Sequence, residues 1–338
     1  MAKEPIIVAR ALATGYRDGK KQTVVHSHLD FTLYAGELTC LLGCNGAGKS
    51  TLLRTLAGAQ PVLGGEVQLM RRPLAGYTAR ELSRTMGLVL TERTLTGGLT
   101  VFELVALGRQ PHTGFFGRLT VHDRTVVERA VQAVGLSDKC ACYVSELSDG
   151  ERQKTMIAKA LVQECPVILL DEPTAFLDVV SRIEIMALLR RLAADEHKAV
   201  LLSTHDVDQA FAMADVLWLM TPHGGMTCGS PEDLALQAQL DRLFRHDGIR
   251  FDPARGCYAP VPRGGGEVLL RAADETLRFW ASNAMCRAGL RVVEQADVPC
   301  AVLTVHSAQQ LCWEYDGQVQ TFASFAALLD SGVTKTGR

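Results

Sequence analysis

The chain has 338 residues, of which 47% are hydrophobic and 21% are charged, and its formal net charge is −2. This length predicts two domains or one large one, with enough apolar residues for a buried core. The balanced charge argues against nucleic acid as a partner, because no basic face dominates. No apolar run of about 18 residues occurs, so we expect no membrane span, and the first residues do not resemble a signal peptide.

The first informative segment is a short apolar run that leads into a glycine-rich loop. Leu38–Leu42 predicts a buried strand, and the residues after it match the phosphate-loop pattern G-x-x-x-x-G-K-[ST]. A helical pattern follows, with Leu52, Leu53 and Leu56 on one face and Gly58 at its C-terminal end. The sequence therefore predicts a strand, a loop and a helix that together bind a nucleoside triphosphate.

Each residue type in this loop has a physical reason. Glycines let backbone N–H groups approach a phosphate closely, and the helix N-terminus adds a partial positive charge. Lys49 supplies a cation for the outer phosphates, and the Ser50 hydroxyl is a ligand for Mg²⁺. The residues expected to surround the phosphates are Gly43, Asn45, Gly46, Ala47, Gly48, Lys49, Ser50 and Thr51.

Further along the chain, a capping box marks the start of another helix. Ser148 and Glu151 have the S-x-x-E spacing, and an amphipathic run with Met156 and Ile157 follows. One interpretation is simply a well-capped helix. The other is that this helix N-terminus, with Ser148 and Gly150, binds a second phosphate.

A second apolar strand carries acidic residues at its end. Val167–Leu170 predicts a strand buried on both faces of a parallel sheet, and Asp171 and Glu172 follow it. Carboxylates at the C-terminal edge of such a strand face the same crevice as the phosphate loop. Asp171 is therefore expected to hold Mg²⁺, and Glu172 to polarise an attacking water. His205 follows a further apolar strand, Ala199–Leu202.

The order of these motifs resembles the ATP-binding subunit of ABC transporters. A phosphate loop, an L-S-x-G-[EQ] sequence, an apolar strand with Asp-Glu and a lone histidine occur in that order within residues 5–250. The resemblance implies an α/β fold, namely a P-loop NTPase ABC cassette with a RecA-like core and a helical arm at about 93–158. We expect strands and helices to alternate around the nucleotide site in residues 5–90 and 160–220.

The resemblance also implies a homodimer whose two copies face head to tail, with ATP and Mg²⁺ between them. Tyr16 would stack on adenine, although an ordinary tyrosine at a strand end is the alternative. Ser148 and Gly150 would contact the γ-phosphate of ATP that is held by the other copy. Asp178 would lie in the loop that communicates across the dimer.

The catalytic roles implied by the resemblance fall on three residues. Asp171 would bind Mg²⁺, and Glu172 would be the general base that activates water. His205 would contact the γ-phosphate and orient the water together with Glu172, although a lone histidine is more often an ordinary surface residue.

Three positions depart from the family's usual pattern. A glutamine that reaches toward Mg²⁺ aligns with Glu92, or with Thr91 if the loop is one residue longer. Asp149 replaces a glycine, and Cys44 stands where proline is frequent. Glu92 still offers an oxygen to Mg²⁺, but both acidic residues add negative charge beside the phosphates. We expect altered metal affinity or turnover, with neutral change as the alternative.

The C-terminal part of the chain has a separate pattern. A nucleotide-binding domain of residues 1–251 is expected to end at a Pro/Gly-rich linker, residues 252–266. Residues 267–338 predict a small α+β domain, which is either a stabilising appendage or a regulatory or dimerising domain. Its expected elements are a strand at 267–271, a helix at 275–288 with Trp280 on its core face, strands at 290–294 and 300–305, a hairpin around Asp316-Gly317, and a last helix capped by Ser324.

The type of ABC protein is inferred from one further stretch. Leu99–Arg109 resembles ATPases that drive import of iron-siderophore chelates, haem and cobalamin (vitamin B12). The resemblance implies a multi-span membrane permease as direct partner and a periplasmic or surface substrate-binding protein as indirect partner. It also implies a peripheral position on the cytoplasmic side of the inner membrane.

Two other classes of protein share parts of this pattern. A soluble ABC ATPase acting on ribosomes or DNA is the alternative, but such proteins carry two cassettes or long coiled coils. A small-molecule kinase uses the same phosphate loop, yet it requires neither the helix at Ser148 nor Glu172 beside Asp171.

Overall fold

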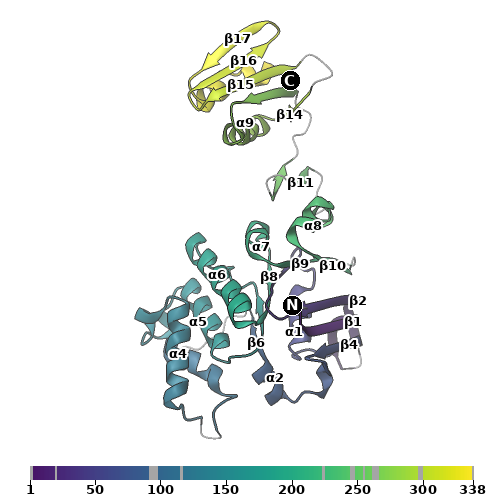
Figure 1. The fold of residues 1–338 in the computed structure, drawn as a ribbon, viewed down its shortest axis with the longest axis vertical. Coiled ribbons are helices and arrows are strands. Elements are labelled where there is room, and N and C mark those ends of the chain that lie inside the picture. The colour runs from purple at the N-terminus through teal and green to yellow at the C-terminus, as the bar shows by residue number, and fades with distance from the viewer. Residues whose placement is uncertain are drawn as a thin grey trace. The chain divides into compact units, whose positions relative to one another are not determined.

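The computed structural model describes most of the chain as two compact units (Figure 1). One unit comprises residues 1–244 and 253–257, and the other comprises residues 245–252 and 258–338. Each has its own cluster of buried hydrophobic residues. The described residues are 3–19, 21–90, 98–114, 117–222, 225–243, 248–253, 256–260, 266–295 and 300–336.

The first unit is built around a six-stranded sheet with the order β10-β9-β3-β8-β7-β6. All neighbouring strands are parallel except β10, which pairs antiparallel with β9. Every residue of β3, β7 and β8 is buried, which confirms the three strands predicted from apolar runs. The strands are β3 (Leu38–Leu42), β6 (Met86–Val89), β7 (Val167–Asp171), β8 (Ala199–Thr204), β9 (Val216–Thr221) and β10 (Gly225–Gly229).

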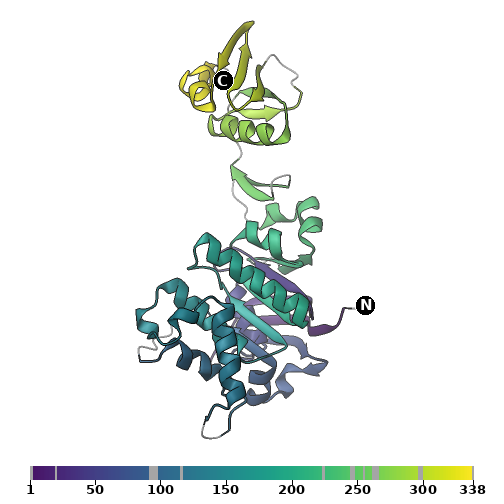
Figure 2. The ribbon, with the colours of Figure 1, turned by 60° about the vertical axis from the view of Figure 1, so that its left-hand side comes forward.

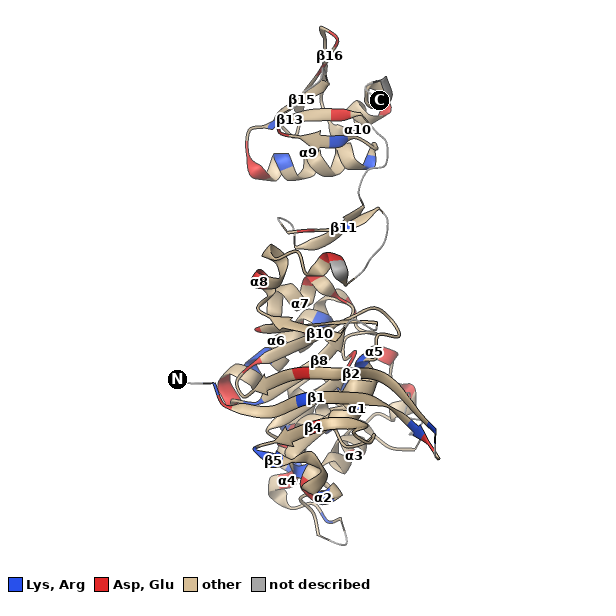
Figure 3. Ribbon diagram, turned by 90° about the vertical axis from the view of Figure 1, so that its right-hand side faces the viewer, with Lys and Arg blue, Asp and Glu red and all other residues tan. Residues whose placement is uncertain are grey.

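A second sheet is antiparallel and has the order β2-β1-β4-β5. It replaces the strand–helix alternation expected in the early part of residues 5–90. Strands β1 and β2 form a long hairpin, from the pair Pro5–Tyr34 to the pair Asp18–Lys21, and Figure 3 shows charges of both signs interspersed along it. The strands are β1 (Pro5–Asp18), β2 (Lys21–Tyr34), β4 (Gly64–Leu69) and β5 (Arg72–Pro73).

Helix α1 (Lys49–Leu56) lies between the two sheets, since it contacts both β1 and β7. Its three leucines are fully buried, as its sequence pattern predicts. Phe31 of β2 packs on Trp218 of β9 with ring centroids 4.5 Å apart. One hydrophobic core therefore joins both sheets and supports the loop that precedes α1.

Three helices that pack on one another, α3, α4 and α5, form the arm that was expected to be helical. Helix α6 lies along the six-stranded sheet, where it contacts β3 and β8 (Figure 2). None of the described helices combines the length and apolar character that a membrane span requires. Besides α1, the described helices of this unit are α2 (Ala79–Thr85), α3 (Val101–Ala106), α4 (Val121–Ala133), α5 (Asp149–Leu161), α6 (Val179–Glu196), α7 (Val207–Met213) and α8 (Pro231–Leu236), with 3₁₀ turns at Leu74–Gly76, Leu107–Arg109, Ser137–Lys139, Val144–Glu146 and Leu240–Arg242.

The second unit contains a five-stranded mixed sheet with the order β14-β13-β15-β16-β17. Asp316 and Gly317 both have positive φ, 50° and 73°, in the turn of the predicted hairpin. Ser324 caps the predicted helix, α10, and a further short helix, α11, follows it. The elements are β13 (Glu267–Ala272), α9 (Glu275–Arg287), β14 (Arg291–Val293), β15 (Ala301–Ser307), β16 (Gln310–Tyr315), β17 (Gln318–Phe322), α10 (Phe325–Asp330) and α11 (Val333–Thr336).

One expectation for the C-terminal part differs from the structure. Trp280 is 57% exposed rather than in the core, because α9 buries Ala281, Ala284 and Met285 and turns the preceding residue outward. The stretch expected to be a linker also contains regular structure. Strand β11 (Ile249–Asp252) ends where this stretch begins, and β12 (Cys257–Pro260) lies within it. The two strands pair as a two-stranded sheet.

Candidate active site

The parallel strands β3, β7 and β8 bring the predicted site residues to one edge of the sheet. Their register pairs Leu42 with Thr204 and Asp171 with Ser203, so the carboxyl ends of the three strands lie side by side. The phosphate loop, the Asp171-Glu172 pair and His205 all begin at these ends. The structure thus confirms that residues far apart in the sequence meet at this edge.

The phosphate loop has the backbone that close approach to an anion requires. Gly48 adopts φ 91°, and a Cβ atom there would lie 2.9 Å from the His26 ring, so a larger residue does not fit. No side chain caps the N-terminus of α1, and its first turn contains no acidic residue. The partial positive charge of this N-terminus is therefore not neutralised locally, which fits a bound phosphate.

Lys49 lies in the middle of the site. Its Nζ donates to the main-chain oxygen of Gly43 at 2.7 Å and lies 3.9 Å from the nearer carboxylate oxygen of Glu172. Burial lowers the pKa of Lys49 below its usual value, although the nearby carboxylates of Glu172 and Asp171 oppose this shift. The phosphates of ATP would supply further negative charge that favours the protonated lysine.

Glu172 links the lysine to the histidine. Its Oε1 faces Lys49, and its Oε2 lies 3.3 Å from Nδ1 of His205. The backbone of Glu172 has φ 46°, a left-handed conformation that is uncommon for a non-glycine residue. This conformation directs the carboxylate between the cation and the imidazole, where a general base for water would be required.

Ser203 connects the two acidic residues from the neighbouring strand. Its hydroxyl donates to Oδ1 of Asp171 at 2.6 Å and accepts from the backbone N–H of Glu172 at 3.0 Å. The sequence pattern assigned no role to Ser203. The available signal was its position two residues before His205, directly after the predicted strand at 199–202.

Tyr16 lies beside α1, close to the end of β1. It is within β1, about half exposed, and its hydroxyl forms a hydrogen bond of 2.7 Å with Oγ1 of Thr51. A half-exposed aromatic ring beside the phosphate loop is suited to stacking on a base. This geometry is compatible with the predicted contact to adenine.

His26 is a second residue that sequence reasoning missed. It is buried on β2, and its Nε2 lies 2.5 Å from the main-chain oxygen of Ala47. The carbonyl can only accept, so His26 donates this bond. Nothing in the sequence near His26 indicated a contact with the phosphate loop, because β2 was not expected to form a separate sheet.

Within one copy of the chain, Ser148 and Gly150 lie at the N-terminus of α5 and not in the phosphate loop. The capping box between Ser148 and Glu151 forms as predicted at the start of α5. A Cβ atom at Gly150 would lie 3.2 Å from the main-chain oxygen of Phe176, in the loop that ends at Asp178, the N-cap of α6. Among the described residues, no hydrogen bond or ion pair joins Ser148 or Gly150 to the phosphate loop.

Of the three residues expected to bind Mg²⁺, the structure describes two, Ser50 and Asp171. Glu92 and its alternative, Thr91, lie outside the described residues. Within the described ranges no cluster of three or more His, Cys, Asp or Glu side chains could hold a metal ion. Mg²⁺ commonly binds through one or two protein oxygens together with phosphates and waters, so Ser50 and Asp171 remain a suitable pair.

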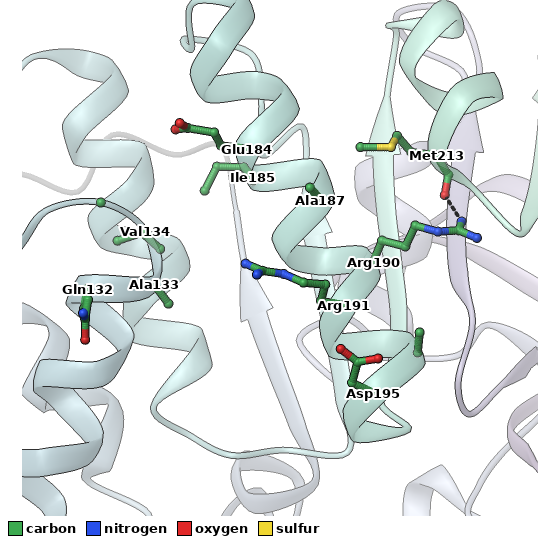
Figure 4. A pocket seen from close by; sticks show the side chains of 12 residues that line it. Gln132, Ala133, Val134, Glu184, Ile185, Ala187, Arg190, Arg191, Asp195 and Met213 are labelled. Carbon is green, nitrogen blue, oxygen red and sulfur yellow. Dashed lines mark hydrogen bonds between the residues drawn. The ribbon is translucent and has the colours of Figure 1, made fainter.

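A pocket of about 720 Å³ lies away from these residues, between the end of α4 and one side of α6 (Figure 4). Its lining includes Glu184, Arg191 and Asp195, together with Arg190, which turns aside to bond the main-chain oxygen of Met213. None of its lining residues belongs to the candidate site.

Comparisons with known proteins agree with this geometry. The family model for the ABC transporter matches residues 26–175, and the model for the iron ABC transporter C-terminal domain matches residues 265–331. An uncharacterized ABC transporter ATP-binding protein of Methanocaldococcus jannaschii is 39% identical over 235 residues, which are 70% of this chain and 81% of that protein. The ferric enterobactin transport ATP-binding protein FepC of Escherichia coli is 34% identical over 261 residues, which are 76% of this chain and 95% of that protein.

A solved structure of an ABC transporter in an inward-facing conformation gives a TM-score of 0.61 at 28% identity. The match covers 72% of this chain and 90% of that one. The sequence motifs, the sheet edge that collects them and these relatives agree, and the chain belongs to the ATP-hydrolysing, ATP-binding subunits of the ABC transporter family.

Proposed function

We propose that this chain powers an ABC importer for an iron chelate, haem or cobalamin. The observation that carries the ATPase part is the convergence of Lys49, Glu172 and His205 at one sheet edge, with distances of 3.9 Å and 3.3 Å between successive partners. The importer part is supported by the stretch Leu99–Arg109 and by a relative whose name specifies ferric enterobactin transport. The iron-transporter match of residues 265–331 supports the same class.

The residues of the site divide the chemical work. Lys49 and the backbone N–H groups of the phosphate loop bind and orient the phosphates. Ser50 and Asp171, with Glu92 as a proposed third ligand, would hold Mg²⁺, which neutralises phosphate charge when bound. Glu172 would accept the proton of the attacking water, and His205 would orient that water. Tyr16 would stack on the base.

The site is completed by a second copy of the chain in this proposal. Ser148 and Gly150 lie at an exposed helix N-terminus, next to the loop that ends at Asp178. In a head-to-tail homodimer each such N-terminus would contact the γ-phosphate held by the partner's phosphate loop. ATP would thus favour closure, and hydrolysis would favour opening.

The partners follow from the same class of protein. A multi-span permease would bind this subunit at the cytoplasmic side of the inner membrane, and a substrate-binding protein outside would deliver the cargo. The cargo would not contact this chain. The unit containing residues 267–336 would act as a regulatory or dimerising domain, for which the iron-transporter match is the support.

The test is a tagged pull-down from detergent-solubilised membranes of the source cell, with partners identified by mass spectrometry. The Lys49→Ala variant, which should weaken nucleotide binding without changing the arm, is the matched control. Recovery of a multi-span permease with both forms supports the transporter role. Recovery of ribosomal or DNA-repair proteins in its place would overturn it and favour the soluble ABC ATPase.

A further inference from the structure

We infer that Ser203 is a positioning residue that holds Asp171 and Glu172 in their working arrangement through one hydroxyl group. The inference rests on the proposed roles of these two carboxylates, and it assigns a role to a third residue of the site. Its effect would pass entirely through Asp171 and Glu172.

The hydrogen bonds of the hydroxyl carry the inference. Ser203 Oγ donates to Asp171 Oδ1 at 2.6 Å and accepts from the Glu172 N–H at 3.0 Å. A serine hydroxyl has a single proton to donate, so its donor capacity is used by Asp171 while one lone pair binds Glu172. Ser203 has 0% exposure, so water does not compete for either bond.

The backbone of Glu172 explains why such support is needed. With φ at 46°, Glu172 occupies a region that persists only where neighbouring groups hold it. Its N–H lies 3.1 Å from the main-chain oxygen of Ser203 as well as 3.0 Å from the hydroxyl. Both oxygens of one β8 residue therefore hold the strained amide in place.

The same bond fixes the rotation of the Asp171 carboxyl group. A carboxylate that binds Mg²⁺ is oriented by its other hydrogen bonds, and loss of such partners typically costs about 10–100-fold in metal affinity or activity. The hydroxyl would thus orient both Asp171, the proposed metal ligand, and Glu172, the proposed general base. If Ser203 had only a structural role, its replacement would lower stability and would have no selective effect on Mg²⁺ binding or turnover.

Three variants of the full-length chain separate these roles. Ser203→Ala removes the hydroxyl, and Ser203→Thr retains it. Thr39→Val is the matched control, because it removes a hydroxyl with 1% exposure from the neighbouring strand β3, away from the site. For each we would measure ATPase kcat and KM, ATP binding at equilibrium with Mg²⁺ and with EDTA, and thermal unfolding.

We expect Ser203→Ala to lower kcat by about tenfold and to reduce the gain in ATP affinity that Mg²⁺ provides. ATP binding in EDTA and the Tm should stay close to wild type, and Ser203→Thr should recover most of the turnover. Wild-type kcat and Mg²⁺ response in Ser203→Ala would overturn the inference. Equal losses in Ser203→Ala, Ser203→Thr and Thr39→Val, in EDTA as in Mg²⁺, would also overturn it, since they indicate a structural role.

Failure of the proposed function has a different signature. A wild-type chain without Mg²⁺-dependent ATPase activity would count against the proposed roles of Asp171 and Glu172, whatever the variants do. An active wild type whose Glu172→Gln variant is inactive, but whose Ser203→Ala variant is unchanged, would refute only the role of Ser203.

Discussion

His26 and Ala47 join the two sheets of the first unit at the phosphate loop. The Nε2 atom of the buried imidazole lies 2.5 Å from the main-chain oxygen of Ala47, and the same ring would contact any side chain at Gly48. The antiparallel sheet therefore supports the loop directly, through one hydrogen bond and through close packing.

Replacement of His26 tests this support. In His26→Leu the Ala47 carbonyl loses its donor, and a buried carbonyl without a partner costs about 1–3 kcal/mol. We expect a lower free energy of unfolding and weaker ATP binding, measured by denaturant titration and by equilibrium binding. His26→Gln, which keeps a donor, should recover part of both losses. Equal ATP affinity in the wild type and the leucine variant would contradict the proposed support.

Replacement of Glu172 tests its proposed role as general base. Glu172→Gln keeps the size of the side chain but accepts no proton from water, so turnover should fall by about 10²–10⁴-fold while ATP remains bound. Steady-state hydrolysis and nucleotide binding measure the two effects. Glu66→Gln on β4, which is exposed, is the matched control. Near-normal hydrolysis by Glu172→Gln would refute this assignment.

The sequence predicted the parts of the fold that short-range chemistry determines. The phosphate loop, the capping box at Ser148 and the Asp316-Gly317 turn each depend on neighbouring residues, and each formed where its pattern occurs. Apolar runs identified the central strands, because a strand buried on both faces must be apolar throughout.

Features that depend on long-range pairing were missed. Half-buried strands such as β1 and β2 give a weaker pattern, so the antiparallel sheet was not predicted and neither was the contact of His26 with the loop. The link from Ser203 to Asp171 depends on the register of β7 against β8, which neither strand's sequence specifies. The prediction for Trp280 was wrong, because helical periodicity places it close to the small apolar residues of α9 that are buried, while the tryptophan itself is exposed.

The buried ion pair between Arg109 and Asp123 should stabilise the arm. Arg109 Nε lies 2.9 Å from Asp123 Oδ1, Nη1 donates to the main-chain oxygen of Val162 at 2.7 Å, and both charged residues are at most 5% exposed. Arg109→Leu would leave Asp123 buried without its cation, which typically costs about 3–5 kcal/mol. Urea unfolding measures this loss. A change within error of wild type would show that the pair contributes nothing.

The carboxyl group of Asp123 should also make the arm sensitive to acid. The hydroxyl of Thr120, then its N–H, and then Arg109 lower the pKa of Asp123 from 3.8 to about 2. Because the folded-state pKa is the lower one, this stabilisation is complete above the ordinary pKa and is lost as the pH falls through about 2. Thr120→Val should raise the pKa of Asp123, as measured by NMR titration of its carboxyl carbon. An unchanged pKa would show that Thr120 is not the main cause of the lowered pKa of Asp123.

Removal of residues 267–338 tests the independence of the C-terminal domain. Its core, which includes Leu303 and Trp313, shares no residue with the core around α1, so each cluster should persist alone. We expect the truncated chain to remain folded and to hydrolyse ATP, as measured by thermal unfolding and by kcat. Regulation by this domain predicts a change in kcat with unchanged ATP binding, whereas a dimerising role predicts a lower apparent mass in light scattering. An aggregated truncated chain would instead show that these residues belong to the core of the cassette.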